Sequence, residues 1–389
     1  MKRNTTIISL LLFLCFSGLA TAQELNNYNL NKEIVAENSL VTEKETLVLY
    51  TKLSLNLKKA DIHDYSFSFY SVNNYYKILP PLERKIAVDS TYINSQGNTH
   101  YFKFTIKPTT PKALLMIAVK SELTGKVFLY DLPLFITKPF NVFNSNGVPV
   151  TSNWANPGTY TLSKSPVTVF YYSHTFPPGL PPMVTRPELE DKEILVESTY
   201  KVYEELAMED QGLYLMQIDT SSTNALPIRV EDKYFPKFTT VQQLVEPLIY
   251  ITSKEEQEQL QKINGDKRLF DKFWLDMTNS AERAKSIIRT FYDRTEVANR
   301  LFTTFKEGWK TDMGMIYIVM GPPDEIERSN KEETWVYLAD RDLPKRKYTF
   351  IRSNSIFSPA HYVLIREKKH AASWFEAIDL LRKGIINQK

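Results

Sequence analysis

The sequence predicts two immunoglobulin-like β-sandwiches followed by an α+β domain at the carboxyl end. Short runs in which apolar and polar residues alternate, separated by Asn, Gly and Pro, continue from Thr46 to Ile218, as in antiparallel sheets with one buried face. Aromatic residues make up 13% of the chain, with 22 Tyr and 22 Phe, and these residue types favour pleated, half-buried surfaces. After Tyr234 the apolar residues recur at three- and four-residue steps, which is typical of amphipathic helices. The 389 residues are enough for two or three such domains.

The amino terminus has the pattern of a secretory signal peptide over residues 1–22. Two basic residues precede an apolar segment at Ile7–Ala20, and Ala20 and Ala22 supply the small residues of a cleavage site. The pattern predicts export and a mature chain that begins at Gln23. The apolar segment is shorter than the roughly 20 residues that span a bilayer, so we expect no membrane-spanning segment in the mature chain. The periplasm is the expected location, with the outer membrane and the cell exterior as alternatives.

The cysteine content and the charge exclude several classes of protein. Cys15, the only cysteine, lies in the expected signal peptide, and Leu14 stands before it where a lipoprotein signal needs a small residue. We therefore expect a mature chain without a lipid anchor, a disulfide or a cysteine metal site. The formal net charge is +3, which becomes 3 − 2 = +1 without Lys2 and Arg3. A chain so close to neutral lacks the basic surface expected of a nucleic-acid-binding protein, so no nucleic-acid partner is expected.

The first β-sandwich is predicted for residues 23–140. Thr46–Leu55 alternates leucines with other residues, and Ser66–Phe69 and Tyr101–Ile106 alternate in the same way. Thr124-Gly125 lies between two apolar runs, which predicts a β-hairpin at this point.

The second β-sandwich is predicted for residues 141–230, and the stretch Pro139–Pro166, which is rich in Asn, Gly and Pro, marks the boundary region. Its strand-like runs are Val167–Ser173, Glu193–Glu197 and Gly212–Ile218. Between the first two lies Phe176–Pro182, in which four prolines favour an extended, stiff loop. We interpret this loop as a connector over the rim of the sandwich, and a proline-rich docking peptide is the alternative.

The α+β domain is predicted for residues 231–389. Ser253 and Glu256 form a capping box at the start of one helix, which Gly265 is expected to end, and an apolar run at Met315–Met320 is expected to be a strand covered on both faces. The other predicted helices are Thr239–Val245, Lys267–Met277, Ser280–Lys306 and Ser373–Ile386, and the other predicted strands are Thr334–Leu338, Tyr348–Arg352 and Tyr362–Arg366.

The densest sequence signature lies between residues 308 and 325, and each of its residues fits a local structural role. Gly308 is placed to end the long helix in a left-handed conformation, Trp309 to pack over that helix end, and Thr311 or Asp312 to bind backbone amides of the turn. The second half is expected to reverse the chain and start another helix, with acidic residues near its positive end. Its residues are Tyr317, Gly321, Pro322, Pro323, Asp324 and Glu325.

Gly308-Trp309-Lys310-Thr311-Asp312, followed by Gly321-Pro322-Pro323-Asp324-Glu325, resembles the signature of the GWxTD domain of bacterial envelope proteins. Arg229–Pro236 and Glu246–Ile251 are similar to the segments that precede that domain, and the likeness extends over roughly residues 212–340. The resemblance implies an export signal, β-rich amino-terminal domains and a carboxyl-terminal signature domain. It implies no established catalytic activity.

The residues that could carry chemistry leave three classes of function open. Asp312, Asp324 and Glu325 could form the pair of carboxylates that a hydrolase uses, but their spacing also satisfies ordinary capping rules. The five histidines are scattered, and no nucleophile elbow, phosphate-binding loop or dinucleotide fingerprint is present, so no metal or cofactor is expected. We expect a non-catalytic module that binds another envelope protein, with a glycan- or peptide-binding protein and a carboxylate-dependent hydrolase as the alternatives. The sequence does not indicate an oligomeric state.

Overall fold

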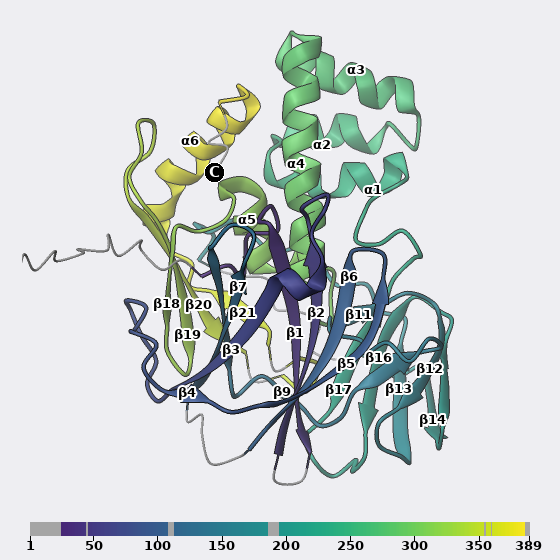
Figure 1. Cartoon of the computed structure of the whole chain (residues 1–389). Helices are drawn as coiled ribbons and strands as arrows, with labels where there is room; N and C mark the ends of the chain where they lie inside the picture. The colour runs from purple at the N-terminus through teal and green to yellow at the C-terminus, as the bar shows by residue number, and fades with distance from the viewer. Residues whose placement is uncertain are drawn as a thin grey trace, which may run out of the picture.

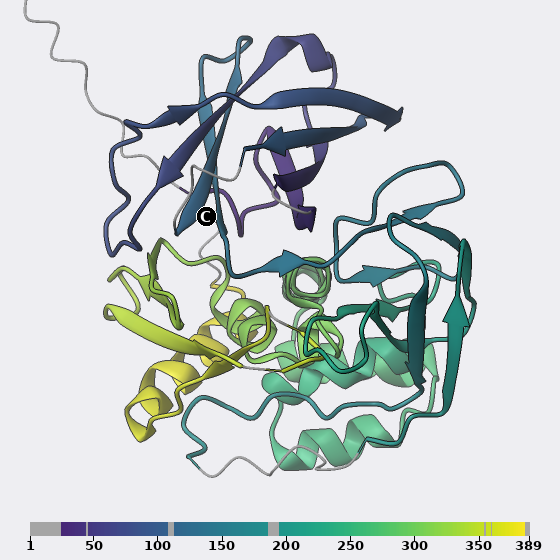
Figure 2. The same cartoon turned by 90° about the horizontal axis from the view of Figure 1, so that it is seen from below.

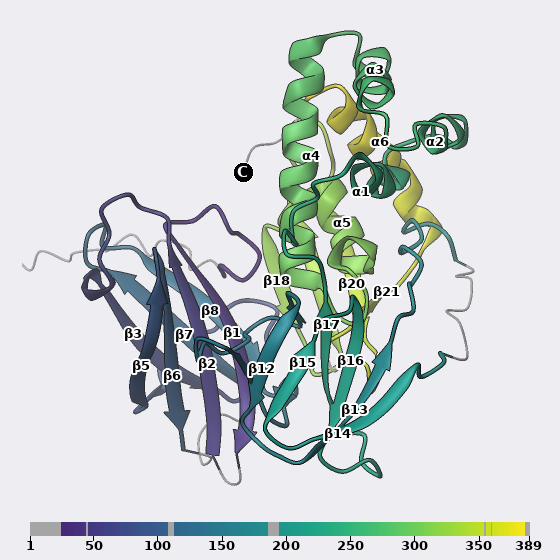
Figure 3. The ribbon, with the colours of Figure 1, turned by 90° about the vertical axis from the view of Figure 1, so that its right-hand side faces the viewer.

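The computed structural model describes residues 25–43, 46–107, 113–185, 194–353, 355–358 and 360–385. The expected signal peptide, Cys15 and the expected cleavage point before Gln23 lie outside these residues. Two groups of strands lie side by side, and most of the helices extend away from both (Figures 1 and 3). Among the described residues, no helix is long and apolar enough to cross a membrane.

The first group of strands is a β-sandwich of a five-stranded and a four-stranded sheet, with the orders β5-β6-β2-β1-β9 and β4-β3-β7-β8. Leu49 and Phe104 of one sheet pack in a common core with Ile117 and Tyr130 of the other. The predicted hairpin at Thr124-Gly125 is confirmed, because β7 and β8 pair antiparallel on either side of it. The strands are β1 (Ile34–Glu43), β2 (Thr46–Leu55), β3 (Tyr65–Val72), β4 (Lys85–Ile86), β5 (Asp89–Gln96), β6 (Thr99–Ile106), β7 (Leu114–Ser121), β8 (Val127–Pro133) and β9 (Thr137–Lys138), and a 3-10 turn, η1 (Ile62–Asp64), precedes β3.

The second group is a β-sandwich of a three-stranded sheet, β10-β12-β15, and a five-stranded sheet, β11-β17-β16-β13-β14. Tyr160 and Leu206 of the smaller sheet share a core with Val169 and Met216 of the larger one. The strand expected at 193–197 is wrong for its described part, because strand structure begins only at Ser198. The strands are β10 (Val142–Asn144), β11 (Trp154–Ala155), β12 (Gly158–Leu162), β13 (Val167–Tyr172), β14 (Ser198–Val202), β15 (Glu205–Met208), β16 (Gly212–Gln217) and β17 (Leu226–Val230).

The carboxyl-terminal part is an α+β domain in which helices cover a four-stranded sheet of order β18-β19-β20-β21 (Figure 2). Its core contains Trp274 and Phe291 from the helices and Trp335 and Phe350 from the sheet. The helices are α1 (Val241–Val245), η2 (Glu246–Tyr250), α2 (Lys254–Gln261), α3 (Lys267–Thr278), α4 (Ala281–Phe302), η3 (Gly308–Lys310), α5 (Asp312–Met320), η4 (Lys368–His370) and α6 (Ala371–Arg382). The strands are β18 (Glu325–Arg328), β19 (Glu332–Tyr337), β20 (Arg346–Arg352) and β21 (Tyr362–Leu364).

Helix boundaries were predicted well where a capping residue marks them. The capping box of Ser253 and Glu256 starts α2, and Ser280 caps α4 through the amide of Arg283. Two ends were predicted wrongly. Helix α2 ends at Gln261, before Gly265, and α4 ends at Phe302, because Thr303 is already extended.

The apolar run Met315–Met320 is helical, so the prediction of a buried strand is wrong. Helix α5 covers Asp312–Met320, and all of its residues except Met320 are buried. A helix covered on every side has no polar face, and its sequence therefore resembles that of a strand covered on both faces. In α6, which overlaps the helix predicted at Ser373–Ile386, the buried residues are Trp374, Ala377 and Leu381, whereas Phe375 is 60% exposed.

The architecture is thus two β-sandwiches followed by an α+β domain, as the sequence predicts. Strand β9 ends at Lys138 and β10 begins at Val142, while β17 ends at Val230 and α1 begins at Val241. The domain boundaries at 140 and 230 stay predictions, which expression of the separate domains would test.

Candidate functional site

Gly308 begins a 3-10 turn that lies against the last turns of α4. A Cβ atom at this position would lie 2.0 Å from the carbonyl oxygen of Ala298, so only glycine fits. The amide of Gly308 donates to Oγ1 of Thr303 at 2.9 Å. Its carbonyl oxygen accepts from Oγ1 of Thr311 at 2.7 Å. The role expected of Gly308 is therefore wrong: it does not end α4 in a left-handed conformation, but allows two backbone segments to approach closely.

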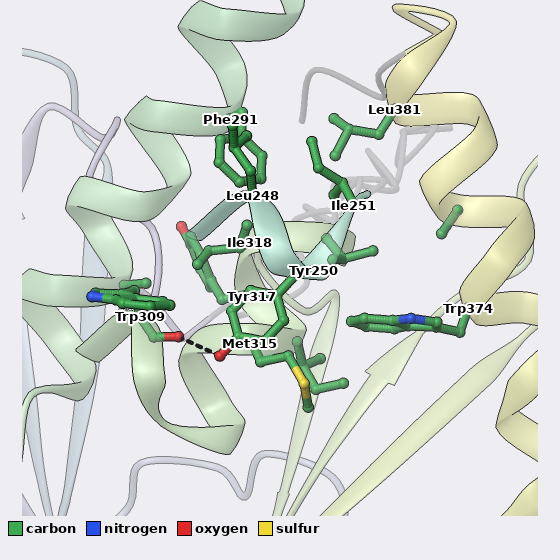
Figure 4. Close-up of a cluster of buried hydrophobic side chains, with 14 of the residues drawn as sticks. Leu248, Tyr250, Ile251, Phe291, Trp309, Met315, Tyr317, Ile318, Trp374 and Leu381 are labelled. Atoms are coloured by element: carbon green, nitrogen blue, oxygen red, sulfur yellow. Dashed lines mark hydrogen bonds between the residues drawn. The ribbon is translucent and has the colours of Figure 1, made fainter. Parts of the chain in front are cut away.

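Trp309 is 3% exposed and lies between α4 and the segment that contains η2. Its amide donates to Oδ1 of Asn299 in α4 at 3.0 Å, and its carbonyl oxygen accepts from the hydroxyl of Tyr250 at 3.0 Å. Figure 4 shows this second hydrogen bond among the apolar side chains around it, including Leu248 and Phe291. Trp309 therefore joins the end of α4 to the core of the α+β domain.

Thr311, and not Asp312, caps α5. Oγ1 of Thr311 accepts from the amide of Gly314 at 3.0 Å, as an N-cap side chain does. Because Thr311 already fills the capping position, Asp312 is the first helical residue, and its side chain faces β21 and the segment after it. Its Oδ2 accepts from the amide of Leu364 at 2.8 Å, and its two carboxylate oxygens accept from Nη1 and Nη2 of Arg366 at 3.0 and 2.5 Å. The expected turn-capping role of Asp312 is thus corrected to one half of a buried, bidentate ion pair.

The proline-rich loop Phe176–Pro182 of the second sandwich contacts the signature directly. The amide of Gly179 donates to the carbonyl oxygen of Lys310 at 2.8 Å, and Arg366 donates to the carbonyl oxygen of Leu180 at 3.1 and 3.3 Å. A Cβ atom on Gly179 would lie 2.6 Å from Oδ1 of Asp312, so the loop passes too close for a larger residue. The interpretation of this loop as a rim connector is therefore wrong, because it joins the second sandwich to the start of α5.

The second half of the signature ends α5 and starts a strand. Gly321 has φ +81°, a conformation that favours glycine, and its carbonyl oxygen accepts from the hydroxyl of Tyr337 at 2.9 Å. Arg294 donates to the carbonyl oxygens of Ile318 and Val319 at 3.2 and 3.0 Å, which places a cation at the negative end of α5. The hydroxyl of Tyr317 donates to the carbonyl oxygen of Tyr28, in the segment before the first sandwich, at 3.0 Å.

No helix follows Pro322 and Pro323, so the dipole role expected of the two acids after them is wrong. Glu325 is exposed and opens β18, and Asp324 accepts from the amide of Leu338 at 2.8 Å. Asp312 is the first residue of α5 and Asp324 lies beyond the other end of this helix, whose nine residues extend over roughly 12–14 Å. Paired catalytic carboxylates stand about 5–9.5 Å apart, so the arrangement does not suit a carboxylate pair built from these acids.

We expect Asp312→Asn to destabilise the chain and Asp324→Asn to leave it almost unchanged. Asparagine at 312 keeps one acceptor but removes the charge that Arg366 needs, and a buried charged hydrogen bond lost in this way costs about 1–3 kcal/mol. At 324 the amide oxygen can still accept from Leu338, so the loss should stay below about 0.5 kcal/mol. Thermal unfolding of both variants beside the unchanged chain measures the difference. Equal midpoints for the two variants would contradict the assigned role of Asp312.

A second group of charges lies beside the signature, and sequence reasoning missed it. Arg229 donates through Nε to Glu231 and forms an ion pair through Nη2 with Glu307 at 3.2 Å. Lys310 in turn contacts Glu307 at 2.8 Å. These side chains come from two segments, 229–231 and 307–310, and both overlap stretches of the sequence that resemble family segments. Resemblance alone could have suggested them, since neither periodicity nor capping rules mark a charge cluster.

The carboxyl groups of this cluster differ in pKa, because burial and the two cations act on each of them to a different extent. Burial raises the pKa of Glu231 to about 7, and the Glu307 carboxylate adds to the effect, although Arg229 opposes it. Burial also acts on Glu307, but Arg229 and Lys310 together lower its pKa below the usual value. The pKa of nearby Glu246 is raised by its partial burial and by Glu307, against the effect of Lys310. Near neutral pH the cluster therefore has one carboxyl group that is ready to gain or lose a proton.

We expect Glu231 to stabilise the folded chain at pH 5, and we expect this stabilisation to decrease as pH rises from 5 to 7. In this range the folded chain keeps the proton that the unfolded chain, with a usual pKa near 4.5, has released. Unfolding then releases a proton, and stability decreases with rising pH until the folded pKa is passed. Glu231→Gln cannot ionise, so the midpoint of the variant minus that of the unchanged chain should rise between pH 5 and 8. A difference that is constant with pH would contradict the raised pKa.

A third polar cluster joins the first sandwich to the α+β domain. Nε and Nη2 of Arg328 donate to Asp131 at 2.7 and 2.9 Å, and Nη1 donates to Glu333. All three side chains are buried, and Asp131 is 0% exposed. The hydroxyls of Tyr76 and Tyr28 donate to Asp131 and Glu333, each at 2.7 Å. Of these residues, all except Tyr76 border a cavity of about 200 Å³, to which Asn27, Thr304, Thr311 and His361 also contribute.

Comparison with known proteins supports the assignment of the carboxyl-terminal part. Residues 212–383 match the model of one protein family, described as the GWxTD domain. No curated protein matches the chain in sequence. The Ig tandem domains of titin align with 51% of this chain and 97% of their own length, with 12% identity and a TM-score of 0.16. The fold assignment depends on the sheets described above and not on this likeness.

Proposed function

We propose, from the premise that this chain carries a GWxTD domain, that it is an exported, non-catalytic protein of the cell envelope that acts as an interaction or assembly module. The observation that supports the proposal is that the signature side chains are used inside the protein. Trp309 and Asp312 are buried, and Asp312 is paired with Arg366, which also binds the second sandwich at Leu180. A signature built in this way fixes the relative positions of domains and leaves their outer surfaces to bind another envelope protein.

The two alternative functions have less support. A hydrolase would need two acids facing one reacting bond, whereas Asp312 is occupied by Arg366 and lies at the other end of α5 from Asp324. A glycan-binding protein would gather exposed aromatic residues on one surface. Among the described residues the exposed tyrosines lie instead on β5, on and just after β14, and after β17; they are Tyr92, Tyr200, Tyr203 and Tyr234.

Export and partner binding are tested together in cells that make the chain. Sequencing the amino terminus of protein purified from the envelope fraction should give Gln23 as the first residue. Crosslinking in intact cells should then capture a distinct envelope protein, and the capture should be lost when Trp309→Ala disrupts the α+β domain. A chain that keeps Met1 and stays in the cytoplasm would contradict the proposed export.

The non-catalytic part of the proposal has its own test. Asp324→Asn combined with Glu325→Gln removes two carboxylates without touching the buried ion pair of Asp312. We expect this double variant to keep both its midpoint of unfolding and its cellular function. Loss of function at an unchanged midpoint would show that these acids act directly, and it would favour the hydrolase if crosslinking still captured the partner.

A further inference from the structure

Strand β14 forms one edge of the five-stranded sheet of the second sandwich. It pairs with β13 from Val167↔Val202 to Tyr171↔Ser198, and among the described residues no strand pairs with its other side. In Figure 1 it lies at the outer margin of that sandwich. An edge strand presents unpaired amides and carbonyls, and soluble proteins ordinarily cover or disrupt such an edge. This edge is instead flanked by exposed apolar residues, since Leu195 is 83% exposed and Tyr203 is 65% exposed.

The sequence of this edge is complementary to itself. We propose that β14 pairs antiparallel with β14 of a second copy of this chain, with Thr199 opposite Thr199 on the two-fold axis. In that register Glu197 of each copy lies opposite Lys201 of the other, and Leu195 lies opposite Tyr203. Opposite charges, paired threonines and apolar contacts each stabilise directly opposed positions in antiparallel sheets.

The charges select this register over its neighbours. A shift that centres the pair on Tyr200 would place Glu197 opposite Tyr203 and Lys201 opposite Thr199, which removes both ion pairs. The residues that carry the pairing, Leu195 through Tyr203 in steps of two, alternate with Val202, which is buried in the core of the second sandwich. They therefore lie on the face of the sheet that points away from the sandwich core, and all five are exposed, so a second copy reaches them without disturbing that core.

The pairing makes the interface isologous and modest in strength. Each contact occurs twice because the same surface is used by both copies. Strand β14 has five residues, and pairing that extends from Leu195 to Tyr203 buries less than the roughly 1,200–2,000 Å² of a stable protein interface. The chain should therefore be monomeric when dilute and dimeric when concentrated. This dimer needs no other protein, so it stands or falls independently of the function proposed above.

Charge exchange in the full chain tests the dimer. Glu197→Lys and Lys201→Glu should each raise the dimer dissociation constant at least tenfold, because each places like charges opposite one another twice. The double variant should recover dimerisation, and an equimolar mixture of the two single variants should form a mixed dimer. Sedimentation equilibrium over a range of concentrations measures all four, with Lys272→Glu on the exposed side of α3 as a control of equal charge change.

Two results of this experiment would overturn the proposal: an unchanged chain that stays monomeric at every concentration, or single variants that associate as well as the control. The equimolar mixture distinguishes a lost ion pair from a failure to fold. Two variants that fail to fold cannot form a mixed dimer, whereas two folded variants with complementary charges can.

Disulfide trapping checks the register. Opposed residues in an antiparallel pair have Cα atoms about 4.5–5.5 Å apart, within the range of a disulfide. Thr199→Cys, in a chain whose Cys15 is replaced by Ala, should therefore crosslink to a dimer on mild oxidation. Ser198→Cys lies opposite position 200, so its two copies are roughly 8 Å apart and should not crosslink. Equal crosslinking of the two variants, or none of either, would contradict the register.

Discussion

Trp309→Ala is expected to lower the free energy of unfolding by about 3–5 kcal/mol, which is a large part of the roughly 5–15 kcal/mol that stabilises a native protein. The indole is buried where η3 meets α4, and its ring lies 6.1 Å from that of Tyr250. Nζ of Lys310 also lies 5.3 Å from the indole, and this cation–π contact would be lost. The two backbone hydrogen bonds of residue 309 can still form in the alanine variant, but they do not replace the packing that is lost with the indole.

Urea unfolding of the purified chain, followed by circular dichroism, measures this effect. Phe375→Ala is the matched control, because its ring is 60% exposed and its loss should cost little. If Trp309→Ala yields no folded protein, Trp309→Phe fills part of the cavity and should give a folded chain of intermediate stability. A Trp309→Ala variant as stable as the Phe375→Ala control would show that residue 309 does not support the core.

Local signals in the sequence predicted local structure. The capping box at Ser253 and the hairpin at Thr124-Gly125 were identified because a capping or turn residue acts within a few positions of itself. The same reasoning predicted a strand at Met315–Met320, because an apolar run six residues long suits either a buried strand or a buried helix. Thr311 decides between them by capping α5, although from the sequence either Thr311 or Asp312 was expected to bind the turn amides.

The contacts that give the signature its role were not predictable in this way. Asp312 meets Arg366, which lies 54 positions away, and both meet a loop near residue 180. Capping rules consider only neighbouring residues, so they assigned Asp312 to its own turn. The second sandwich, α4, α5 and β21 all contact the segment from Gly308 to Asp312. Glycine is required three times for close approach around this segment, at Gly179, Gly308 and Gly314, and this accounts for these glycines without a catalytic role.

The signature joins the second sandwich to the α+β domain, and the buried ions join the first. Asp131 and Tyr76 belong to the first sandwich, whereas Arg328 and Glu333 belong to the sheet of the α+β domain. A further contact joins the first sandwich to α4: Glu37 of β1 accepts a hydrogen bond from Arg300 of α4 at 3.0 Å. Burial acts to raise the pKa of Glu37, but Lys52 and Arg300 lower it, so this carboxylate stays charged and paired. The first sandwich is therefore attached through ion pairs more than through a shared apolar core.

Arg328→Met is accordingly expected to cost about 3–5 kcal/mol, because it leaves two buried carboxylates without their cation. The loss should appear first between domains: hydrogen exchange should speed up in β8, β18 and β19, whereas β12 and β16 of the second sandwich should keep their protection. Arg268→Met is the matched control, since the Arg268 side chain is 93% exposed.

A triple variant separates the effect of unpaired charge from that of lost packing. Asp131→Asn and Glu333→Gln, added to Arg328→Met, remove both buried charges but keep an acceptor for the hydroxyls of Tyr76 and Tyr28. Because the carboxylates no longer need a cation, the triple variant should regain part of the stability that Arg328→Met loses. The assignment would be wrong if Arg328→Met melted at the temperature of the Arg268→Met control. It would also be wrong if the triple variant were less stable than Arg328→Met, since lost packing alone would then explain the effect.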